Sequence, residues 1–590
     1  MLDAVEQDGS DLAALARRAR DTSRPIVLIG FVDQENLGLG YLAATLRQYG
    51  YAVTIFDFER DPADVLAEAK ASNPLIIGFS LIFQFYLPKF AALIRYLRGN
   101  GIACHFTIGG HFPSLSYQHT LELIPELDSV VRFEGEETLL ELADLLGTGR
   151  DYRGIAGIAY MRDGAVVCGP LRPLVRDLDT LPYPARTYRR RAFLGRCSTH
   201  LVASWGCIRT CSFCSIHMFY RTAPGKVVRT RNPARVVDEM AMLHEEHGIS
   251  IFMFQDDDFP VFGVRWRQWA NDFCDQLERH RLPGRILWKI NCRADAVDLT
   301  LFARMRDCGL YLVYMGLESG NEEGLKTLHK QITVEQNIRA VAILKELGLR
   351  FEFGFMLFEP ATTFETVRQD LDFLRTIVGD GSTAATFCRM VPYDGTPIKE
   401  DLAKAGRLRG DVTNPYYDFL DPRLDDFCRA LSEILDVSGW VHGLEALSPT
   451  LNFVWSELAV MDRLFPRLPD LSSYRQSLQA ITAASNNLLF QIVEDMSFVY
   501  SDGRQMIWSS RTLGPKCQAF LERLLDERND FVAQNQDILM GALRQPAGAR
   551  PQPPAVTGAC MVQRQPRIGR LAGPIIAPPV QPGCSKYRFR

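Results

Sequence analysis

The chain has 590 residues, too many for one hydrophobic core, and this length predicts three or four domains. With 47% hydrophobic and 23% charged residues, the composition is that of a globular protein and excludes a disordered or fibrous chain. The net charge of −4 includes seven basic and no acidic residues in positions 546–590. The rest of the chain is therefore more acidic than the total, and we do not expect it to bind nucleic acid.

We expect neither a signal peptide nor a membrane span from the sequence. The first twenty residues include acidic side chains and lack the apolar centre of a secretory signal. The longest apolar stretch, residues 74–88, is too short to cross a bilayer and is interrupted by Ser80 and Gln84. Fourteen cysteines without disulfide-framework spacing are typical of a reducing compartment. The sequence therefore predicts a cytoplasmic protein.

After an extension over residues 1–24, residues 25–150 alternate short apolar runs with segments of helical period. This alternation predicts an α/β domain, a doubly wound (Rossmann-like) parallel sheet with helices on both faces. The expected strands are 26–30, 52–56, 75–79, 103–108 and 130–133. Ligands of such sheets bind beyond the carboxyl ends of the strands, so the loops there are the candidate site.

Residues 151–195 are expected to form a connector that contains a hairpin around Arg162-Asp163-Gly164. Six strand-and-helix units follow in residues 196–410 and predict a partial (β/α)6 barrel. Their strands are expected to end at Ser204, Phe254, Ile290, Gly316, Phe358 and Val391. Residues 411–545 predict a helical domain, in which Trp440, Trp455 and Tyr500 are expected in the core.

The tail, residues 546–590, is rich in proline and basic residues and has no apolar period, so we expect it to be disordered. Its two cysteines, Cys560 and Cys584, are expected to be free thiols.

The densest chemical signal is the loop CIRTCSFC after the first barrel strand, which contains Cys207, Cys211 and Cys214. Three thiolates in one short loop suit a metal centre, and they leave one coordination position open. Two interpretations follow from the spacing: an open iron–sulfur cluster, or a zinc knuckle that His217 completes.

With Phe213 before the last cysteine, the loop reads CxxxCx-aromatic-C and resembles the radical S-adenosylmethionine (SAM) enzymes. The resemblance implies a [4Fe-4S] cluster on the three cysteines, with SAM chelating the free iron. It also implies that one electron from the cluster cleaves SAM to a 5′-deoxyadenosyl radical, which abstracts a hydrogen atom from the substrate. The barrel at 196–410 is the fold of that family.

Other barrel loops support the resemblance. Asp256-Asp257-Asp258-Phe259 is similar to a DDNF-like segment near SAM's amino group, although a solvated loop or a metal site is an alternative. Arg293 is expected to pair with SAM's carboxylate, or with Asp295 at the surface. The segment 316–320 is close to a GxESG pattern, which places Glu318 and Ser319 at SAM. Lys330 also resembles the family, or is an ordinary exposed lysine.

Two late loops depart from or complete the family pattern. The fifth strand ends in FEPATT instead of GxPGET, so its loop is expected to serve the substrate. The sixth leads into residues 391–397, a turn that resembles the PxxGT closing these barrels.

Three loops of the first sheet resemble a cobalamin-binding domain. Asp33 to Gly38 fits a DxHxxG signature except that Glu35 stands at the histidine position. Ser80 stands at the serine of an SxL motif, and Gly109-Gly110 offers bare backbone to a flat macrocycle. Bound cobalamin should then lack a histidine as its lower ligand. A plain doubly wound domain, structural or nucleotide-binding, is the alternative.

Together these resemblances imply a cobalamin-dependent radical SAM enzyme, most commonly a methyltransferase acting on an unactivated carbon or on phosphorus. Its cofactors would be the cluster, SAM and cobalamin; its partners, a small-molecule or peptide substrate and a flavodoxin- or ferredoxin-like reductant. Oxidative cyclisation or rearrangement, and a non-enzymatic cobalamin sensor, are the alternatives. A methylthiotransferase needs a second N-terminal cysteine cluster, whereas only Cys104 and Cys168 precede Cys197.

Overall fold

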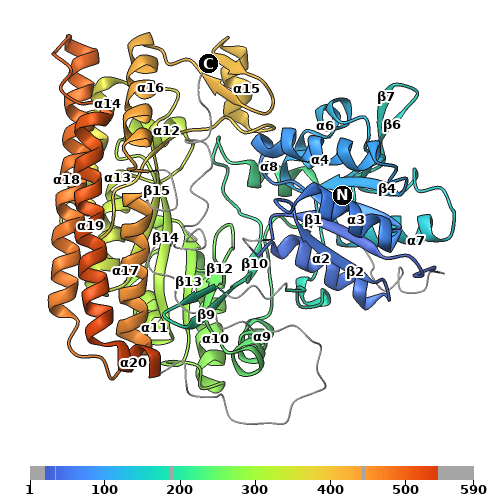
Figure 1. The fold of residues 1–590 in the computed structure, drawn as a ribbon, viewed down its shortest axis with the longest axis horizontal. Coiled ribbons are helices and arrows are strands. Elements are labelled where there is room, and N and C mark those ends of the chain that lie inside the picture. Colours follow the sequence, from blue (N-terminus) through green and yellow to red (C-terminus); the bar gives the residue numbers. More distant parts are fainter. Residues whose placement is uncertain (1–19, 33–34, 187–190, 442–445, 542–590) are drawn as a thin grey trace, which may run out of the picture.

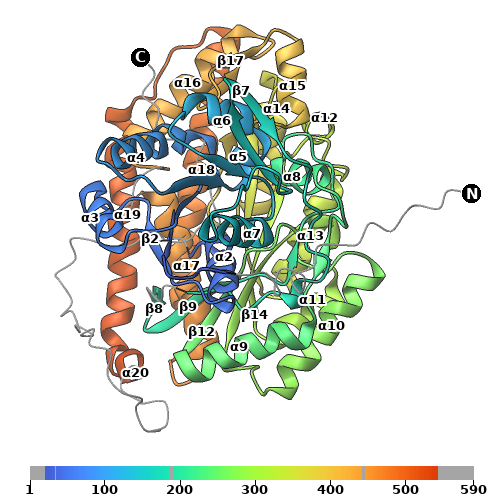
Figure 2. The ribbon, with the colours of Figure 1, turned by 90° about the vertical axis from the view of Figure 1, so that its right-hand side faces the viewer.

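Two seven-stranded sheets and a helical layer make up the protein. The computed structural model describes residues 20–32, 35–186, 191–441 and 446–541. The N-terminal domain lies on one side of the barrel and the C-terminal helices lie on the other (Figure 1). Viewed from the side of the N-terminal domain, its sheet and helices lie in front of part of the barrel, and α9 and α10 remain visible below them (Figure 2). Asp33 and the tail 546–590, with Cys560 and Cys584, lie outside the described residues.

The N-terminal sheet has the predicted parallel strands. Its order is β2-β1-β3-β4-β5-β6-β7, with β1 (Ile26–Gly30), β2 (Val53–Asp57), β3 (Ile76–Ser80), β4 (His105–Gly109) and β5 (Ser129–Val131). Separate hydrophobic clusters pack on its two faces, which is why β1 reads as the unbroken apolar run IVLIG. The helices are α2 (Leu37–Gln48), α3 (Pro62–Ser72), α4 (Leu87–Gly99), α5 (His111–Leu115), α6 (Tyr117–Leu123) and α7 (Glu136–Gly147).

The expected hairpin is present as β6 (Ile158–Arg162) and β7 (Ala165–Cys168). It pairs antiparallel with β5 and so extends the N-terminal sheet. The sheet therefore continues past residue 150 into the segment expected to be a connector.

The second sheet is the predicted partial barrel. Its order is β16-β15-β14-β13-β12-β9-β8, and all pairs except β8–β9 are parallel. The strands are β8 (Arg191–Phe193), β9 (Arg196–Leu201), β12 (Ile249–Phe254), β13 (Leu287–Cys292), β14 (Leu310–Glu318), β15 (Arg350–Phe358) and β16 (Cys388–Arg389). The helices are α8 (Ser215–Thr222), α9 (Pro233–His247), α10 (Gly263–Arg279), α11 (Leu299–Asp307), α12 (Glu322–Thr327), α13 (Val334–Glu346), α14 (Phe364–Val378) and α15 (Pro397–Lys404).

Four of the six predicted strand ends differ from the structure. The strands β13, β14 and β16 end two residues from the predicted Ile290, Gly316 and Val391. The first barrel strand ends at Leu201, not at Ser204. Ser204 and Trp205 form the separate strand β10 (Ser204–Trp205), which pairs antiparallel with β11 (Arg229–Thr230). The cysteine loop therefore begins from a short two-stranded ribbon instead of the barrel sheet itself.

The C-terminal region begins with a hairpin that the sequence did not predict, β17 (Leu408–Gly410) and β18 (Pro415–Tyr417). The predicted helices follow as α16 (Pro422–Val437), α17 (Leu447–Leu464), α18 (Ser472–Asp502), α19 (Ser510–Gln534) and α20 (Gln536–Gly541). They share one hydrophobic cluster with the barrel, in which Trp440 and Trp455 are buried as expected, and Tyr500 packs against it. None of the described helices is long and apolar enough to cross a membrane.

Candidate functional site

The three cysteines of the loop line one large cavity. Cys207, Cys211 and Cys214 are free thiols that border a cavity of about 810 Å³ together with residues of both sheets. The backbone N–H of Arg209 donates to Cys207 Sγ at 3.5 Å, and the Arg293 guanidinium donates to Cys211 Sγ at 3.6 Å. Burial raises the pKa of Cys214 to about 12, so its thiolate needs a positive partner. Three thiols that border one cavity, two of which accept a hydrogen bond at sulfur, fit a cluster with an open iron.

His217 does not join this lining. The residue is buried at the start of α8, and its Nδ1 lies 3.2 Å from the carbonyl oxygen of Cys214. Phe213 does line the cavity, beside the thiols.

The acidic loop after β12 faces the same cavity, and all three carboxylates line it where we expected one or two. Asp256 accepts from the Ala203 N–H at 3.1 Å and from the Ser204 hydroxyl at 2.6 Å. Asp257 accepts from the Gly206 N–H at 3.0 Å. These two residues therefore hold the start of the cysteine loop.

Asp258 differs from its two neighbours. Its Oδ1 is buried and has no hydrogen-bond partner among the described residues. Burial raises the pKa of this carboxyl to about 6, in spite of the nearby Arg209 and Arg293. An orphaned acceptor in the cavity wall fits the ammonium of an amino-acid ligand such as SAM.

Arg293, Glu318 and Lys330 form a buried charged group. Arg293 is 6% exposed and donates to Asp295 Oδ1 at 3.1 Å and to the Lys330 carbonyl oxygen, so it is not a surface ion pair. Lys330 is 5% exposed, which contradicts the exposed-lysine alternative, and its Nζ lies 3.0 Å from Glu318 Oε1. A Cβ at Gly316 would stand 2.3 Å from that same oxygen, so the glycine of the GxESG-like pattern makes room for the ion pair.

Ser319 lies away from the cavity lining. Its hydroxyl donates to Asp370 Oδ1 at 3.2 Å, within a hydrogen-bonded loop that also includes Asn321. The structure therefore places Ser319 behind Glu318, in a position to support that loop.

The loop FEPATT after β15 also closes on itself. Glu359 is buried and accepts from the Ala361 N–H at 2.7 Å, and neither residue lines the cavity. The expectation that this loop serves the substrate gains no support from its placement. The PxxGT-like turn does reach the cavity through Tyr393, and Gln84 of the N-terminal domain accepts from the Asp394 N–H at 3.0 Å.

Gly38, Ser80, Gly109 and Gly110 all line the cavity from the N-terminal domain. The protein's own backbone also limits the residues at the paired glycines. A Cβ at Gly110, where φ is +106°, would stand 2.3 Å from the Leu81 carbonyl oxygen, and one at Gly109 would stand 3.0 Å from that of Val131. The backbone therefore requires a glycine at position 110 and leaves little room for a side chain at position 109. A Cβ at Gly38 would meet only the Asn36 side chain, so the space beside Gly38 is less crowded than the space beside Gly109 and Gly110.

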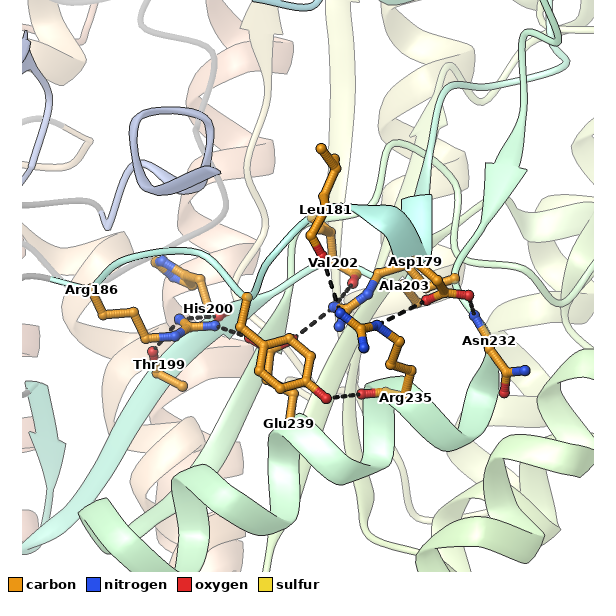
Figure 3. Close-up of polar contacts among 12 residues, drawn as sticks. Asp179, Leu181, Arg186, Thr199, His200, Val202, Ala203, Asn232, Arg235 and Glu239 are labelled. Carbon is orange, nitrogen blue, oxygen red and sulfur yellow. Dashed lines mark hydrogen bonds and ion pairs between the residues drawn. The ribbon is translucent and has the colours of Figure 1, made fainter. Parts of the chain in front are cut away.

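Glu35 connects the N-terminal domain to the barrel. Its Oε2 accepts from the Thr199 hydroxyl at 2.8 Å and from the His200 N–H at 2.7 Å, both on β9. Arg186 donates to the same Thr199 hydroxyl, to the His200 carbonyl oxygen, and to Glu239 of α9 at 2.7 Å (Figure 3). The carboxylate that replaces the histidine of the signature is thus used to join two domains.

This arrangement predicts the ligation of bound cobalamin. With the Glu35 carboxylate bonded to β9, we expect electron paramagnetic resonance of the cobalt(II) state to show no hyperfine splitting from a protein nitrogen. Two histidines, His111 and His200, line the cavity, so His111→Phe and His200→Phe are the control variants. Protein-nitrogen splitting that either substitution removes would contradict the prediction and identify the ligand.

Sequence reasoning missed several lining residues in the barrel interior, among them Asn291, Tyr314 and Glu352. The sequence does contain a pattern that could have predicted these positions. Polar or small residues stand at every second position, at Tyr314, Gly316 and Glu318 on β14 and at Glu352 and Gly354 on β15. Alternation of this kind marks the inward face of a barrel strand.

Comparisons with known proteins agree with this geometry. Two family models match the chain: the B12 binding domain over residues 25–143 and the Radical SAM superfamily over residues 202–374. An uncharacterized methyltransferase from Pyrococcus horikoshii is 30% identical over 395 residues, which cover 65% of this chain and 82% of that protein. An anaerobic magnesium-protoporphyrin IX monomethyl ester cyclase from Rubrivivax gelatinosus is 27% identical, over 68% of this chain and 71% of the relative.

Among solved structures, the cobalamin-dependent S-adenosylmethionine radical enzyme OxsB with aqua-cobalamin bound has a TM-score of 0.64 at 18% identity. The match covers 89% of this chain and 84% of OxsB, and so extends the likeness in fold to the C-terminal helices.

Proposed function

The chain belongs to the cobalamin-dependent radical SAM enzymes, and from this premise we propose that it methylates an unactivated carbon, or phosphorus, of a small-molecule or peptidic metabolite. The observation that carries the proposal is the single cavity, which the cysteine loop, the N-terminal sheet and the barrel interior line together. A methyl carrier and a radical source can act on one substrate only if they open into one space.

We assign the cofactors to residues of this cavity and its supporting loops. Cys207, Cys211 and Cys214 would hold the cluster. Phe213, Asp256, Asp257, Arg293 and Glu318 would surround SAM, and Ser319 would support the loop of Glu318. Asp33, Glu35, Gly38, Ser80, Gly109 and Gly110 would contact or position cobalamin. When bound, these groups supply a 5′-deoxyadenosyl radical and a transferable methyl group. Asp258 is a further SAM candidate because of its orphaned oxygen.

The chain's own residues would orient the ligands and exclude water. Asp256 and Asp257 accept hydrogen bonds from the backbone that leads into the cysteine loop and so hold it in place. The ion pair between Glu318 and Lys330 holds these two side chains at the cavity wall. Phe83 of the N-terminal domain and Tyr393 of the barrel both line the cavity, and their ring centroids are 6.4 Å apart. A closed, dry site protects a radical from side reactions.

The first test of methylation is the stoichiometry of the by-products. Methyl transfer and radical formation each consume one SAM, so S-adenosylhomocysteine and 5′-deoxyadenosine should accumulate in about equal amounts with the correct substrate. Deuterium from SAM labelled in its methyl group should appear in the product. Mass spectrometry of the product and chromatography of the nucleosides measure both quantities.

The second candidate is oxidative cyclisation or rearrangement, which the 27% identity to the Rubrivivax gelatinosus cyclase favours. It takes the place of methylation if 5′-deoxyadenosine forms while no deuterium reaches the product. A non-enzymatic cobalamin sensor would not need the cysteine loop or the groups that donate hydrogen bonds to its sulfur atoms.

We also propose that a flavodoxin- or ferredoxin-like protein supplies the electron and that the enzyme works in the cytoplasm. The fourteen cysteines of the sequence lack disulfide-framework spacing, which supports a reducing compartment.

A further inference from the structure

A buried glutamate in the barrel interior has no assigned role. Glu352 is the third residue of β15, is 7% exposed, and lines the cavity. Within the described residues its carboxylate takes part in no hydrogen bond and in no ion pair. The residues before and after it on the strand are both phenylalanine, which offers no polar partner. Buried carboxylates normally have partners, because an unpaired one retains the full cost of desolvation.

The neighbouring cations do not donate to this carboxylate. Arg350 donates to the Ser382 carbonyl oxygen at 2.6 Å and to Asn452 Oδ1 at 2.9 Å. Lys289 is fully buried and donates to Asn291 Oδ1. Both cations act on Glu352 only through space, while burial raises its pKa. The hydrogen-bonding capacity of Glu352 therefore remains available to a ligand.

Glu352 lies below the cofactor end of the cavity. It is in register with Tyr314 of β14, whereas Glu318 is in register with Phe355, three residues further along β15. At the rise of a β-strand this step corresponds to about 10 Å. Between the two positions on β15 lies Gly354, where a Cβ would stand 2.8 Å from the Tyr314 hydroxyl and 3.5 Å from Glu318 Oε2, and these residues all line the same cavity as Glu352. A ligand bound at Glu352 can thus extend towards the SAM residues.

We propose that Glu352 is the recognition group of the substrate site and binds an alkylammonium group, so that the substrate is an elongated amine. Phe355, Met356 and Ala384 line the same cavity and suit an apolar body on that amine. The lining favours a cation over an anion, because its carboxylates outnumber its cationic side chains, which are Arg209, Arg293 and Lys330. The inference rests on the proposed function, since it takes the barrel interior as the substrate site.

The test uses three probes of similar shape on the enzyme loaded with cluster and cobalamin: phenethylamine, phenethyl alcohol and hydrocinnamate. We expect calorimetric titration to show the amine binding most tightly and the carboxylate least. Glu352→Gln keeps the size of the side chain and removes its charge, so it should lower the affinity for phenethylamine by about tenfold or more. It should change the affinity for the alcohol little.

Two further variants keep the result interpretable. Glu352→Asp retains the charge on a shorter side chain and should give intermediate amine binding. Glu433→Gln, at an exposed glutamate of α16, should change nothing. Amine binding that Glu352→Gln leaves unchanged, a preference for hydrocinnamate, or no binding of any probe at millimolar concentration would each overturn the inference.

The two proposals fail separately. An enzyme that binds the amine through Glu352 but incorporates no deuterium from labelled SAM rejects methylation alone. Deuterium incorporation without a Glu352-dependent amine preference rejects the recognition role alone.

Discussion

Replacing Cys207, Cys211 and Cys214 together by Ala is expected to abolish both the iron–sulfur cluster and SAM cleavage. The three thiols supply every protein ligand that the loop offers, and SAM binds only to an iron that the cluster provides. After anaerobic reconstitution with iron and sulfide, the wild-type spectrum should change when SAM is added. The triple variant should show neither the cluster absorption nor any 5′-deoxyadenosine.

The control for this experiment is Cys168→Ala, an exposed cysteine on β7. It should leave cluster content and SAM cleavage at the wild-type level. Circular dichroism of the triple variant separates loss of the cluster from loss of the fold. A folded triple variant that still makes 5′-deoxyadenosine would refute the assignment of the cluster.

Local patterns were sufficient to predict the parallel strands of both sheets. The run IVLIG at β1 and the run ISIFMF at β12 are buried at every position, as parallel strands between helices require. The errors arose where pairing partners are distant. The hairpin β6–β7 is visible in the sequence, but its attachment to β5 is not, and Ser204 pairs with Thr230 across a long loop.

The cysteine loop was predictable because its ligands are contiguous, whereas residues that act through tertiary contacts were not. Lys330 reads as a surface lysine until the fold buries its ammonium against Glu318. In the sequence, Glu35 is only a residue that cannot replace the histidine ligand of cobalt. In the structure, β9 supplies two hydrogen-bond donors to its carboxylate. Gly110 reads as a ligand cradle, although the nearby Leu81 carbonyl requires it. In each case the deciding atom lies on another segment of the chain.

Glu239→Ala is expected to destabilise the protein by about 3–5 kcal/mol, the range for removing one partner of a buried ion pair. Glu239 of α9 is fully buried and lies between two guanidinium groups, 2.7 Å from Arg186 and 2.8 Å from Arg231 (Figure 3 labels Glu239 and Arg186). Both arginines are themselves buried, so alanine leaves two charges without their shared carboxylate. Denaturation in urea under anaerobic conditions measures the loss.

The neighbouring residue provides a matched control on the same helix. Asp238 is exposed, and among the described residues it pairs with His280 alone, at 3.3 Å, so Asp238→Ala should change the free energy of unfolding by no more than about 0.5 kcal/mol. Because Arg186 also bonds the strand that Glu35 holds, Glu239→Ala should in addition weaken cobalamin binding, which Asp238→Ala should not. Equal stability losses in the two variants would show that the buried carboxylate does not hold this junction together, and that the arginines find other acceptors.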